Sequence, residues 1–290
     1  MQPTFIAHNI RLDDGRTTMP ELPWTLDQSS VVHATGRLLD LAFPAGRAGR
    51  SIVDVGCLEG GHTVEFARTG MIATGLEVRD SNLANCRYVQ RNLHLDTLRF
   101  VQDDAMNIAR HGPFDAVFAC GLLYHLDRPR AFLTDAASVC KRMIVLHTHI
   151  ANVAETPARE HYRLSDIAEN EGAEGRWYTE YHDVTTEQLD AMRETSWSNK
   201  RSFWLTKACL LQSLRDVGFD TVLECFDCMS DIRADMTDGY YARQDRVLIV
   251  GLKSGVAPGV AEQMDIMRRS TSWRVTAPLR ALGRAVRSRR

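Results

Sequence analysis

The residues most able to do chemistry begin in a short stretch, residues 51–61, where an apolar β-branched run enters a glycine-rich turn. Glycine lets the backbone bend sharply at Gly56 and come close to a ligand at Gly60 and Gly61, where a Cβ would collide. About 20 residues further on, Glu77 ends a second apolar run, where an acidic side chain can hold the hydroxyls of a ribose. The pattern predicts a nucleoside-binding strand, turn and helix.

Two later segments extend this arrangement of strand ends. Residues 100–105 form an apolar run that closes on the carboxylate of Asp104, and residues 114–120 form a further strand. The turn lacks the G-x-G-x-x-G spacing that a dinucleotide pyrophosphate requires. The glycine turn alone therefore does not identify the ligand, and the later strand ends supply the context.

The order of these pieces resembles the class I S-adenosylmethionine-dependent methyltransferases, over roughly residues 50–150. The matching residues are Asp54, Gly56, Gly60, Glu77, Asp104-Ala105, and Phe114-Asp115 leading to Leu122-Leu123-Tyr124-His125-Leu126. This chain departs from the family at the middle glycine of the loop, which is Leu58 here, with Glu59 beside it.

The resemblance implies S-adenosyl-L-methionine as the cofactor. In this family the first loop cradles the methionine portion, the equivalent of Glu77 binds the ribose, and the equivalent of Asp104 meets the adenine amino group. The cofactor-binding residues that follow from it are Asp54, Gly56, Cys57, Gly60, Glu77, Asp104, Ala105 and Cys120.

Three histidines at predicted strand ends are the candidate catalytic residues. Methyl transfer from a sulfonium requires an aligned acceptor and, for a hydroxyl, removal of its proton, which a neutral histidine does well near pH 7. His125 follows the fourth strand at the ligand-binding edge of the sheet, while His147 and His149 close the fifth strand and point to one face. We predict that one of them is the general base. Two alternatives are a histidine pair that binds a divalent ion and histidines that merely order a loop; no metal is predicted.

The segment 151–204 is longer than a simple connection requires and is rich in aromatic residues. It is predicted to be an insertion that covers the active site. Its Tyr and Trp rings can stack on a sugar or a base, or they can anchor the segment to the domain. The predicted acceptor-binding residues are Tyr124, Trp177, Tyr178, Tyr181 and His182.

The elements that must position these residues form a regular alternation, which predicts an α/β fold with a doubly wound, seven-stranded sheet. Strands are expected near 51–56, 71–77, 97–102, 114–120, 142–148, 219–226 and 245–252, and helices near 60–69, 80–93, 128–140 and 205–216. By resemblance, the last two strands form an antiparallel pair at the edge. We expect an N-terminal cap segment (1–48), whose helical stripe over 31–41 covers the cofactor pocket, a methyltransferase domain (49–254) and a basic tail (255–290).

The bulk properties fit one core with appendages, because the chain has 290 residues and 44% of them are hydrophobic. It shows neither a long apolar run nor a basic and apolar leader, so a cytoplasmic location is expected. Seven irregularly placed cysteines indicate reduced thiols. Cys225 and Cys228 are close in sequence, but a metal site would need a second pair.

The net charge of −2 is unevenly distributed, because the final segment is rich in arginine and leaves an acidic body. An acidic body does not favour broad nucleic-acid binding. The tail from Thr271 has the pattern of a basic amphipathic helix, which either lies on an anionic membrane surface or packs on protein. Residues 272–280 also resemble tails of bacterial cell-surface polysaccharide biosynthesis enzymes, which favours a carbohydrate hydroxyl as the acceptor.

Three functions remain open from the sequence. The favoured one is O-methylation of a glycan or other small molecule. Residues 114–126 and 204–219 also resemble enzymes that transfer a carboxymethyl group from a cofactor derivative to the wobble uridine of transfer RNA, but the acidic body argues against this. The third is a non-catalytic cofactor-binding scaffold.

Overall fold

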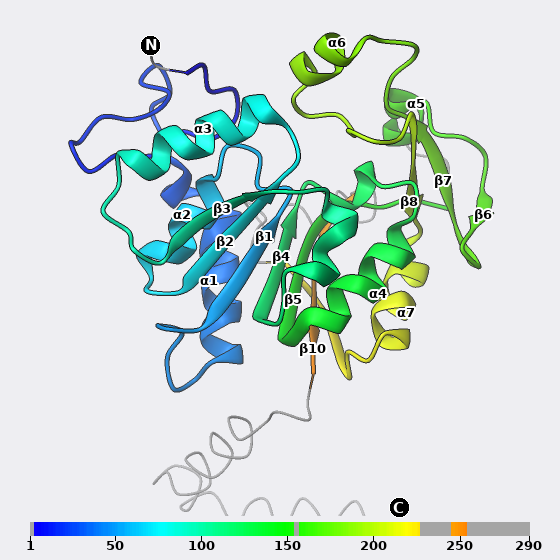
Figure 1. The fold of residues 1–290 in the computed structure, drawn as a ribbon. Coiled ribbons are helices and arrows are strands. Elements are labelled where there is room, and N and C mark those ends of the chain that lie inside the picture. Colours follow the sequence, from blue (N-terminus) through cyan, green and yellow to red (C-terminus); the bar gives the residue numbers. More distant parts are fainter. Residues whose placement is uncertain (1–2, 154–156, 227–244, 254–290) are drawn as a thin grey trace, which may run out of the picture.

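The computed structural model describes residues 3–153, 157–226 and 245–253, which contain a seven-stranded sheet with helices on both faces (Figure 1). The strand order is β3-β2-β1-β4-β5-β10-β9. The strands are β1 (Ser51–Val55), β2 (Ile72–Glu77), β3 (Leu98–Gln102), β4 (Phe114–Cys120), β5 (Cys140–His149), β9 (Thr221–Cys225) and β10 (Arg246–Leu252). Strands β1 to β5 run parallel, whereas β10 is antiparallel to both of its neighbours. The predicted seven-stranded sheet with an antiparallel edge pair is therefore confirmed.

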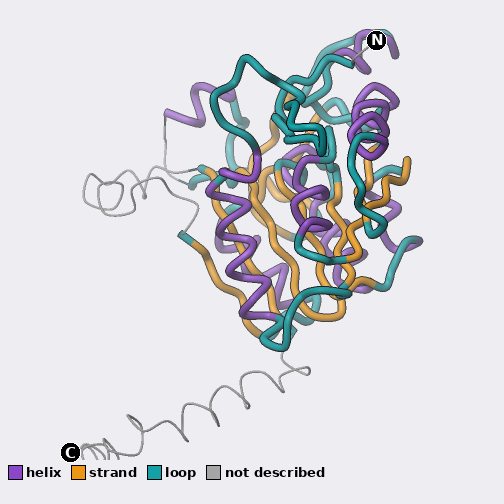
Figure 2. Tube along the Cα trace, turned by 90° about the vertical axis from the view of Figure 1, so that its left-hand side faces the viewer, coloured by secondary structure: helices purple, strands orange, loops and turns teal. Residues whose placement is uncertain are grey.

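The helices form the two outer layers. They are α1 (Ser30–Ala42), α2 (Gly61–Arg68) and α3 (Asp80–Arg91) on one face, and α4 (Pro129–Val139) and α7 (Lys207–Asp216) on the other. Successive strand residues point to opposite faces, so Ile52 packs in the α1–α2 layer and Val53 in the α4–α7 layer. Figure 2 shows the strands between these helices. Both faces of the central strands are consequently buried, which explains their continuous apolar runs.

Helix α1 does not cover the pocket as the sequence predicts. Its Ala34, Leu39 and Ala42 are buried in the same apolar cluster as Ile52, so the helix packs on the face of the sheet. The part of the N-terminal segment that reaches the ligand-binding edge is irregular chain around His8. An apolar stripe identifies a buried helical face but not what that face is buried against.

The insertion contains a second, three-stranded antiparallel sheet, which the sequence analysis missed. It consists of β6 (Ala168–Asn170), β7 (Ala173–Thr179) and β8 (Arg201–Leu205), accompanied by α5 (Pro157–Tyr162) and α6 (Thr186–Ala191). Strand β7 contains Gly175, where an added Cβ would lie 2.2 Å from the carbonyl oxygen of Trp204. Glycine allows this close approach but also disguises the strand pattern.

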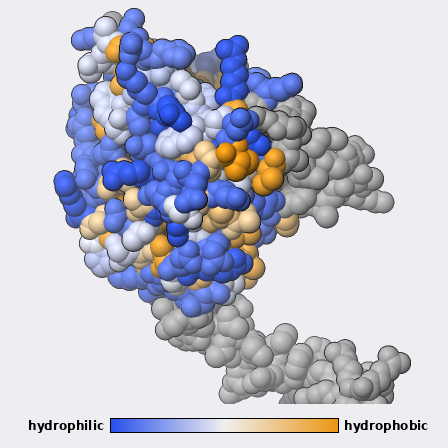
Figure 3. All heavy atoms as spheres, turned by 90° about the vertical axis from the view of Figure 1, so that its right-hand side faces the viewer, coloured by the Kyte–Doolittle hydropathy of each residue, from blue (hydrophilic) through white to orange (hydrophobic). Residues whose placement is uncertain are grey.

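No helix within the described ranges is long and apolar enough to cross a membrane. The predicted amphipathic tail and Cys228 lie outside the described residues. The side of the molecule that carries the insertion is mostly hydrophilic, with hydrophobic side chains in a few small, scattered groups (Figure 3).

Candidate functional site

A cavity of about 300 Å³ lies at the carboxyl ends of β1, β2 and β4, where the sequence predicts the cofactor pocket. We call it the central cavity. Its walls come from the glycine-rich turn, the ends of the parallel strands and residues 193–198 of the insertion. The predicted site residues that line it are Asp54, Gly56, Cys57, Glu77, Asp104, Ala105, Cys120, Tyr124 and His125. This edge is where open α/β sheets bind ligands.

The glycines of the turn serve different purposes. Gly56 lines the central cavity with a φ of 68°, in the left-handed region that favours glycine. Gly60, predicted to bind the cofactor, does not line the cavity. A Cβ at Gly60 would lie 2.5 Å from the ring of Phe100, and one at Gly61 would lie 2.3 Å from a side chain of the N-terminal segment. Close packing of α2, rather than approach of a ligand, therefore explains these two glycines.

Two buried carboxylates stand in the wall of the cavity. Glu77 is 6% exposed, and its two oxygens accept hydrogen bonds from the backbone N–H groups of Leu58 and Arg79, each at 2.9 Å. Asp54 is 1% exposed and accepts a hydrogen bond from the hydroxyl of Thr63 at 2.7 Å. Burial raises the pKa of Glu77 and raises that of Asp54 to about 7. Both carboxyl groups can therefore interact with hydrogen-bond donors or a positive charge on a ligand in the cavity.

The end of β3 supplies the next part of the wall. Asp104 caps a short 3₁₀ helix, Ala105–Arg110, by accepting a hydrogen bond from the backbone N–H of Met106 at 2.9 Å. The neighbouring Asp103 is held by the ring of His111 at 2.6 Å. These contacts fix the chain so that Asp104 and Ala105 both line the cavity.

His125 faces the cavity with a carboxylate behind it. It ends the 3₁₀ helix Leu123–His125, and its Nδ1 lies 2.9 Å from Oε1 of Glu180, which directly follows β7. The side chain of Glu180 is 1% exposed and also accepts a hydrogen bond from the backbone N–H of Ser196. Because the carboxylate accepts the Nδ1 proton, the other ring nitrogen is left as a proton acceptor. The sequence analysis missed Glu180.

The other two candidate bases do not line the central cavity. Nδ1 of His147 lies 3.3 Å from Sγ of Cys120, and burial lowers the pKa of this histidine to about 3. His149 pairs with Asp245 at 3.2 Å and stacks on the ring of Trp204, with the ring centroids 4.8 Å apart. The strand geometry predicts their shared face correctly, but packing occupies that face. Across the described residues, no cluster of three or more His, Cys, Asp or Glu has the arrangement of a metal site.

Two of the five predicted acceptor-binding residues, Trp177 and Tyr178, lie on the small sheet instead. Trp177 lies beneath the guanidinium of Arg201, 4.4 Å from ring centroid to Cζ, and Tyr178 packs on Trp204. All five predicted acceptor-binding residues lie within the described ranges, and Tyr124 is the one among them that lines the central cavity. The positions of Trp177 and Tyr178 on the small sheet explain why aromatic content alone did not identify the lining residues.

The remaining two predicted acceptor residues lie at the border of the insertion. The hydroxyl of Tyr181 donates to the carbonyl oxygen of Trp197 at 3.4 Å, and His182 is exposed. Trp197 itself lines the central cavity. Tyr181 therefore supports a cavity residue without lining the cavity.

Residues 189–198, which we call the closing segment, cover one side of the cavity and are held by Arg79. This side chain is only 2% exposed, and its guanidinium donates to the carbonyl oxygens of Thr195 and Ser196 at 2.8 and 3.1 Å. It also lies over the ring of Trp197, 4.9 Å from the centroid. An arginine two residues beyond the end of β2 thus fixes a segment more than 100 residues away in sequence.

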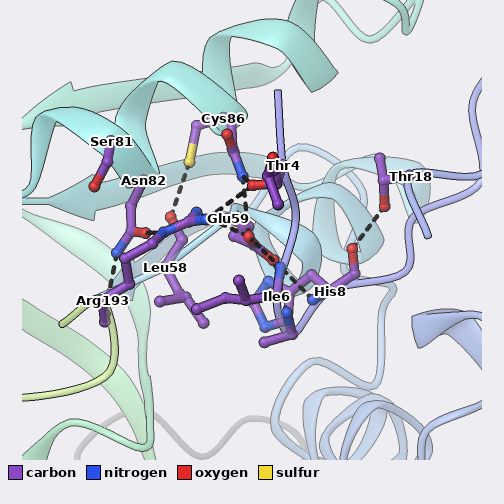
Figure 4. A network of polar contacts seen from close by, with 12 residues as sticks. Thr4, Ile6, His8, Thr18, Leu58, Glu59, Ser81, Asn82, Cys86 and Arg193 are labelled. Carbon is purple, nitrogen blue, oxygen red and sulfur yellow. Dashed lines mark hydrogen bonds and ion pairs between the residues drawn. The ribbon is translucent and has the colours of Figure 1, made fainter. Parts of the chain in front are cut away.

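Glu59 joins the closing segment to the N-terminal segment (Figure 4). Its carboxylate is fully buried and accepts five hydrogen bonds. The donors are the backbone N–H groups of Ile6, Ala7 and His8, the side-chain amide of Asn85, and the guanidinium of Arg193. Glu59, which follows Leu58 in the glycine-rich turn, therefore links the N-terminal segment, α3 and the closing segment.

His8 adds an unpredicted side chain to the cavity wall. Its Nδ1 accepts a hydrogen bond from the backbone N–H of Gly61 at 3.0 Å, and burial lowers its pKa to about 4. The ring is consequently neutral, with its second nitrogen protonated. A single histidine in irregular chain has no periodic pattern by which the sequence could identify it.

Comparison with known proteins agrees with this architecture. Residues 53–144 match the methyltransferase domain family. Ubiquinone biosynthesis O-methyltransferases from Psychrobacter cryohalolentis and Psychrobacter arcticus are each 35% identical over 92 residues, which is 30% of this chain and 35% of theirs. The match thus spans about a third of the length of these curated relatives.

Two solved structures extend the likeness beyond the matched domain. The N-terminal domain of EvdMO1 with SAH bound is 25% identical, with a TM-score of 0.57, covering 78% of this chain and 82% of that one. The same domain in the presence of SAH and D-fucose is 24% identical, with a TM-score of 0.60, covering 84% of this chain and 90% of that one. Together with the sheet order, these similarities identify residues 53–144 as a methyltransferase domain on the fold of the class I S-adenosylmethionine-dependent methyltransferases.

Proposed function

We propose that this protein binds S-adenosylmethionine in the central cavity and catalyses methylation of a hydroxyl oxygen on a carbohydrate or other small molecule. The observation that carries this proposal is the His125–Glu180 pair, which faces the same cavity as Glu77 and Asp104. A base supported by a buried carboxylate is what a hydroxyl acceptor requires, because its proton must leave as the oxygen attacks.

The lining residues fit the cofactor. Each oxygen of Glu77 accepts a single backbone hydrogen bond, so the carboxylate retains lone pairs for the two ribose hydroxyls. Asp104 is positioned for an amino group, and Asp54 places a carboxyl beside the positively charged portion. The volume of about 300 Å³ lies in the range of small-molecule sites. When bound, the cofactor supplies an activated methyl group on a sulfonium.

The remaining chemistry belongs to the protein. The Nε2 atom of His125 takes the proton of the acceptor hydroxyl, and the carboxylate of Glu180 stabilises the imidazolium that forms. Tyr124 and Trp197 lie on the cavity wall, where an aromatic face can orient the acceptor. The residues of this chain thus align the acceptor and receive its proton.

Two similarities support an oxygen acceptor. The 35%-identical Psychrobacter relatives are named O-methyltransferases. The resemblance of residues 272–280 to tails of polysaccharide biosynthesis enzymes supports a carbohydrate acceptor and a role in polysaccharide biosynthesis. We propose that the arginines of the tail contact a membrane surface or a protein. We also propose that the protein works in the cytoplasm.

The test has a binding step and a turnover step. Calorimetry with S-adenosylhomocysteine should show binding that Glu77→Ala weakens. Labelled methyl transfer to sugars and glycans should then be lost in His125→Gln and kept in His94→Gln, an exposed histidine that does not line the cavity. Product from His125→Gln at the wild-type rate refutes the assignment of the base. Salt-sensitive methylation of transfer RNA would instead favour the wobble-uridine alternative, and cofactor binding without any product would favour the scaffold.

A further inference from the structure

Three arginines line the central cavity, and two of them have their donors occupied by the protein. Arg79 is bonded to carbonyl oxygens of the closing segment, and Arg193 to the carboxylate of Glu59 at 2.8 Å. The guanidinium of the third, Arg246, forms no hydrogen bond or ion pair with any residue of the described ranges. Its guanidinium lies over the ring of Tyr124, 5.7 Å from the centroid. A ring face attracts the charge but accepts few of the five N–H donors.

Arg246 lies at the catalytic side of the cavity. It begins β10 and is paired in register with His149 at the end of β5. The ring of Tyr124, beneath its guanidinium, is 4.2 Å from the ring of His125. The charge of Arg246 is also, after burial, a cause of the lowered pKa of His147. The arginine is therefore close to the proposed base and separate from the acids at the ends of β2 and β3.

The charged residues that line the cavity are also separated, with acids at the strand ends and Arg246 near the proposed base. Its acidic lining is Asp54, Glu77, Asp103, Asp104 and Glu194. Four of these belong to the strand ends that suit the cofactor. Glu194 comes from the closing segment. Glu194 and Arg246 both lie in the described ranges, and their side chains do not form an ion pair with each other. An anionic group in the cavity is thus repelled from the cofactor side and attracted to Arg246.

We propose that Arg246 binds an anionic group, a carboxylate or a phosphate, on the methyl acceptor. The inference rests on the proposed function and narrows its substrate class to acidic or phosphorylated hydroxyl compounds. A planar guanidinium matches both anions through paired N–H donors. Binding the anion there would hold a nearby hydroxyl of the same molecule against His125.

The test is calorimetry on the complete chain saturated with S-adenosylhomocysteine. The probes are glucuronate, glucose 1-phosphate and, as the neutral member, glucose. We expect at least one anion to bind about tenfold more tightly than glucose, and the preferred anion identifies the carboxylate or the phosphate as the recognised group. In Arg246→Met the preference should fall to within about twofold, while Arg201→Met should keep it. Arg201 is a matched control because it also lies over an aromatic ring, that of Trp177, but does not line the cavity.

Other outcomes overturn the inference. These are equal affinities for all three probes, no binding of any probe to the loaded protein, or a preference that survives in Arg246→Met. A loss of S-adenosylhomocysteine affinity in Arg246→Met by more than about tenfold would assign the arginine to the cofactor instead. The proposed function fails separately, when the wild-type protein does not bind S-adenosylhomocysteine at all. Unchanged S-adenosylhomocysteine affinity in the variant also shows that it is folded.

Discussion

Asp54→Asn should change how the stability of the cofactor-free protein depends on pH. The wild-type carboxyl is 1% exposed, and burial raises its pKa from the usual 3.8 to about 7. Asparagine has nearly the same shape and can still accept the hydroxyl of Thr63 through its carbonyl oxygen. The substitution therefore removes the titration with little change in packing.

The sign follows from proton binding. Between about pH 4 and pH 7 the folded state holds a proton on Asp54 that the unfolded state has released, so the free energy of unfolding falls as the pH rises. A shift of about 3 pKa units corresponds to about 4 kcal/mol across this window, as an order of magnitude. Above pH 7 both states are ionised and the dependence ends. Relative to wild type, Asp54→Asn should gain about this amount between pH 4 and pH 8.

Urea unfolding at a series of pH values measures the difference between the two proteins. Histidines 8, 62 and 147 have lowered pKa values and act in the opposite direction, but they are common to both proteins and cancel in the difference. Asp14→Asn is the flat control, because Arg16 lowers the pKa of that exposed carboxyl below 3.8 and its titration falls below the window from pH 4 to pH 8. A difference between Asp54→Asn and wild type that stays constant from pH 4 to pH 8 refutes the reasoning.

The remaining predictions concern the base, the junction and the turn. Glu180→Gln should lower kcat by about 10- to 100-fold with little change in KM, because a charge-assisted hydrogen bond to the imidazolium is lost; rate assays would contradict this if KM alone changed. Glu59→Gln should cost about 3 kcal/mol of unfolding free energy, since its partner Arg193 loses its counter-ion, and chemical denaturation measures it. Gly60→Ala should cost more than about 2 kcal/mol because its Cβ meets Phe100, whereas Gly15→Ala, with a similar φ and open space, should cost about 1 kcal/mol. Equal costs at the two glycines would contradict the packing argument.

The sequence predicted the sheet well because its signals are local. Each parallel strand is a short apolar run between turn residues, and buried parallel strands have this pattern by necessity. Glu77 and Asp104 were identified for the same reason, since a residue at the end of a parallel strand must lie at the ligand-binding edge. Strand β6 was missed because it has three residues, and β7 was missed because Gly175 interrupts its alternation.

Local sequence patterns do not identify the side chains that complete the site. Glu180 meets His125 across 55 residues, and Arg193 meets Glu59 across 134. Such pairs exist only after the insertion has folded onto the domain. The distinction between His125 and the pair His147 and His149 depended on the same packing, because Trp204 and Asp245 occupy the face that the strand period predicts.

From the junction at Glu59 we infer that binding of the cofactor and binding of the proposed acceptor are coupled. A fully buried carboxylate must be paired, and here its partners come from the N-terminal segment and from Arg193 of the closing segment. Arg79, two residues beyond the end of β2, holds the same segment at a second point. The wall of the cofactor side is therefore built partly by the insertion that also places Glu180 behind the base. Because one folded unit contributes to both halves of the cavity, a change that loosens the closing segment must alter cofactor affinity and base orientation together.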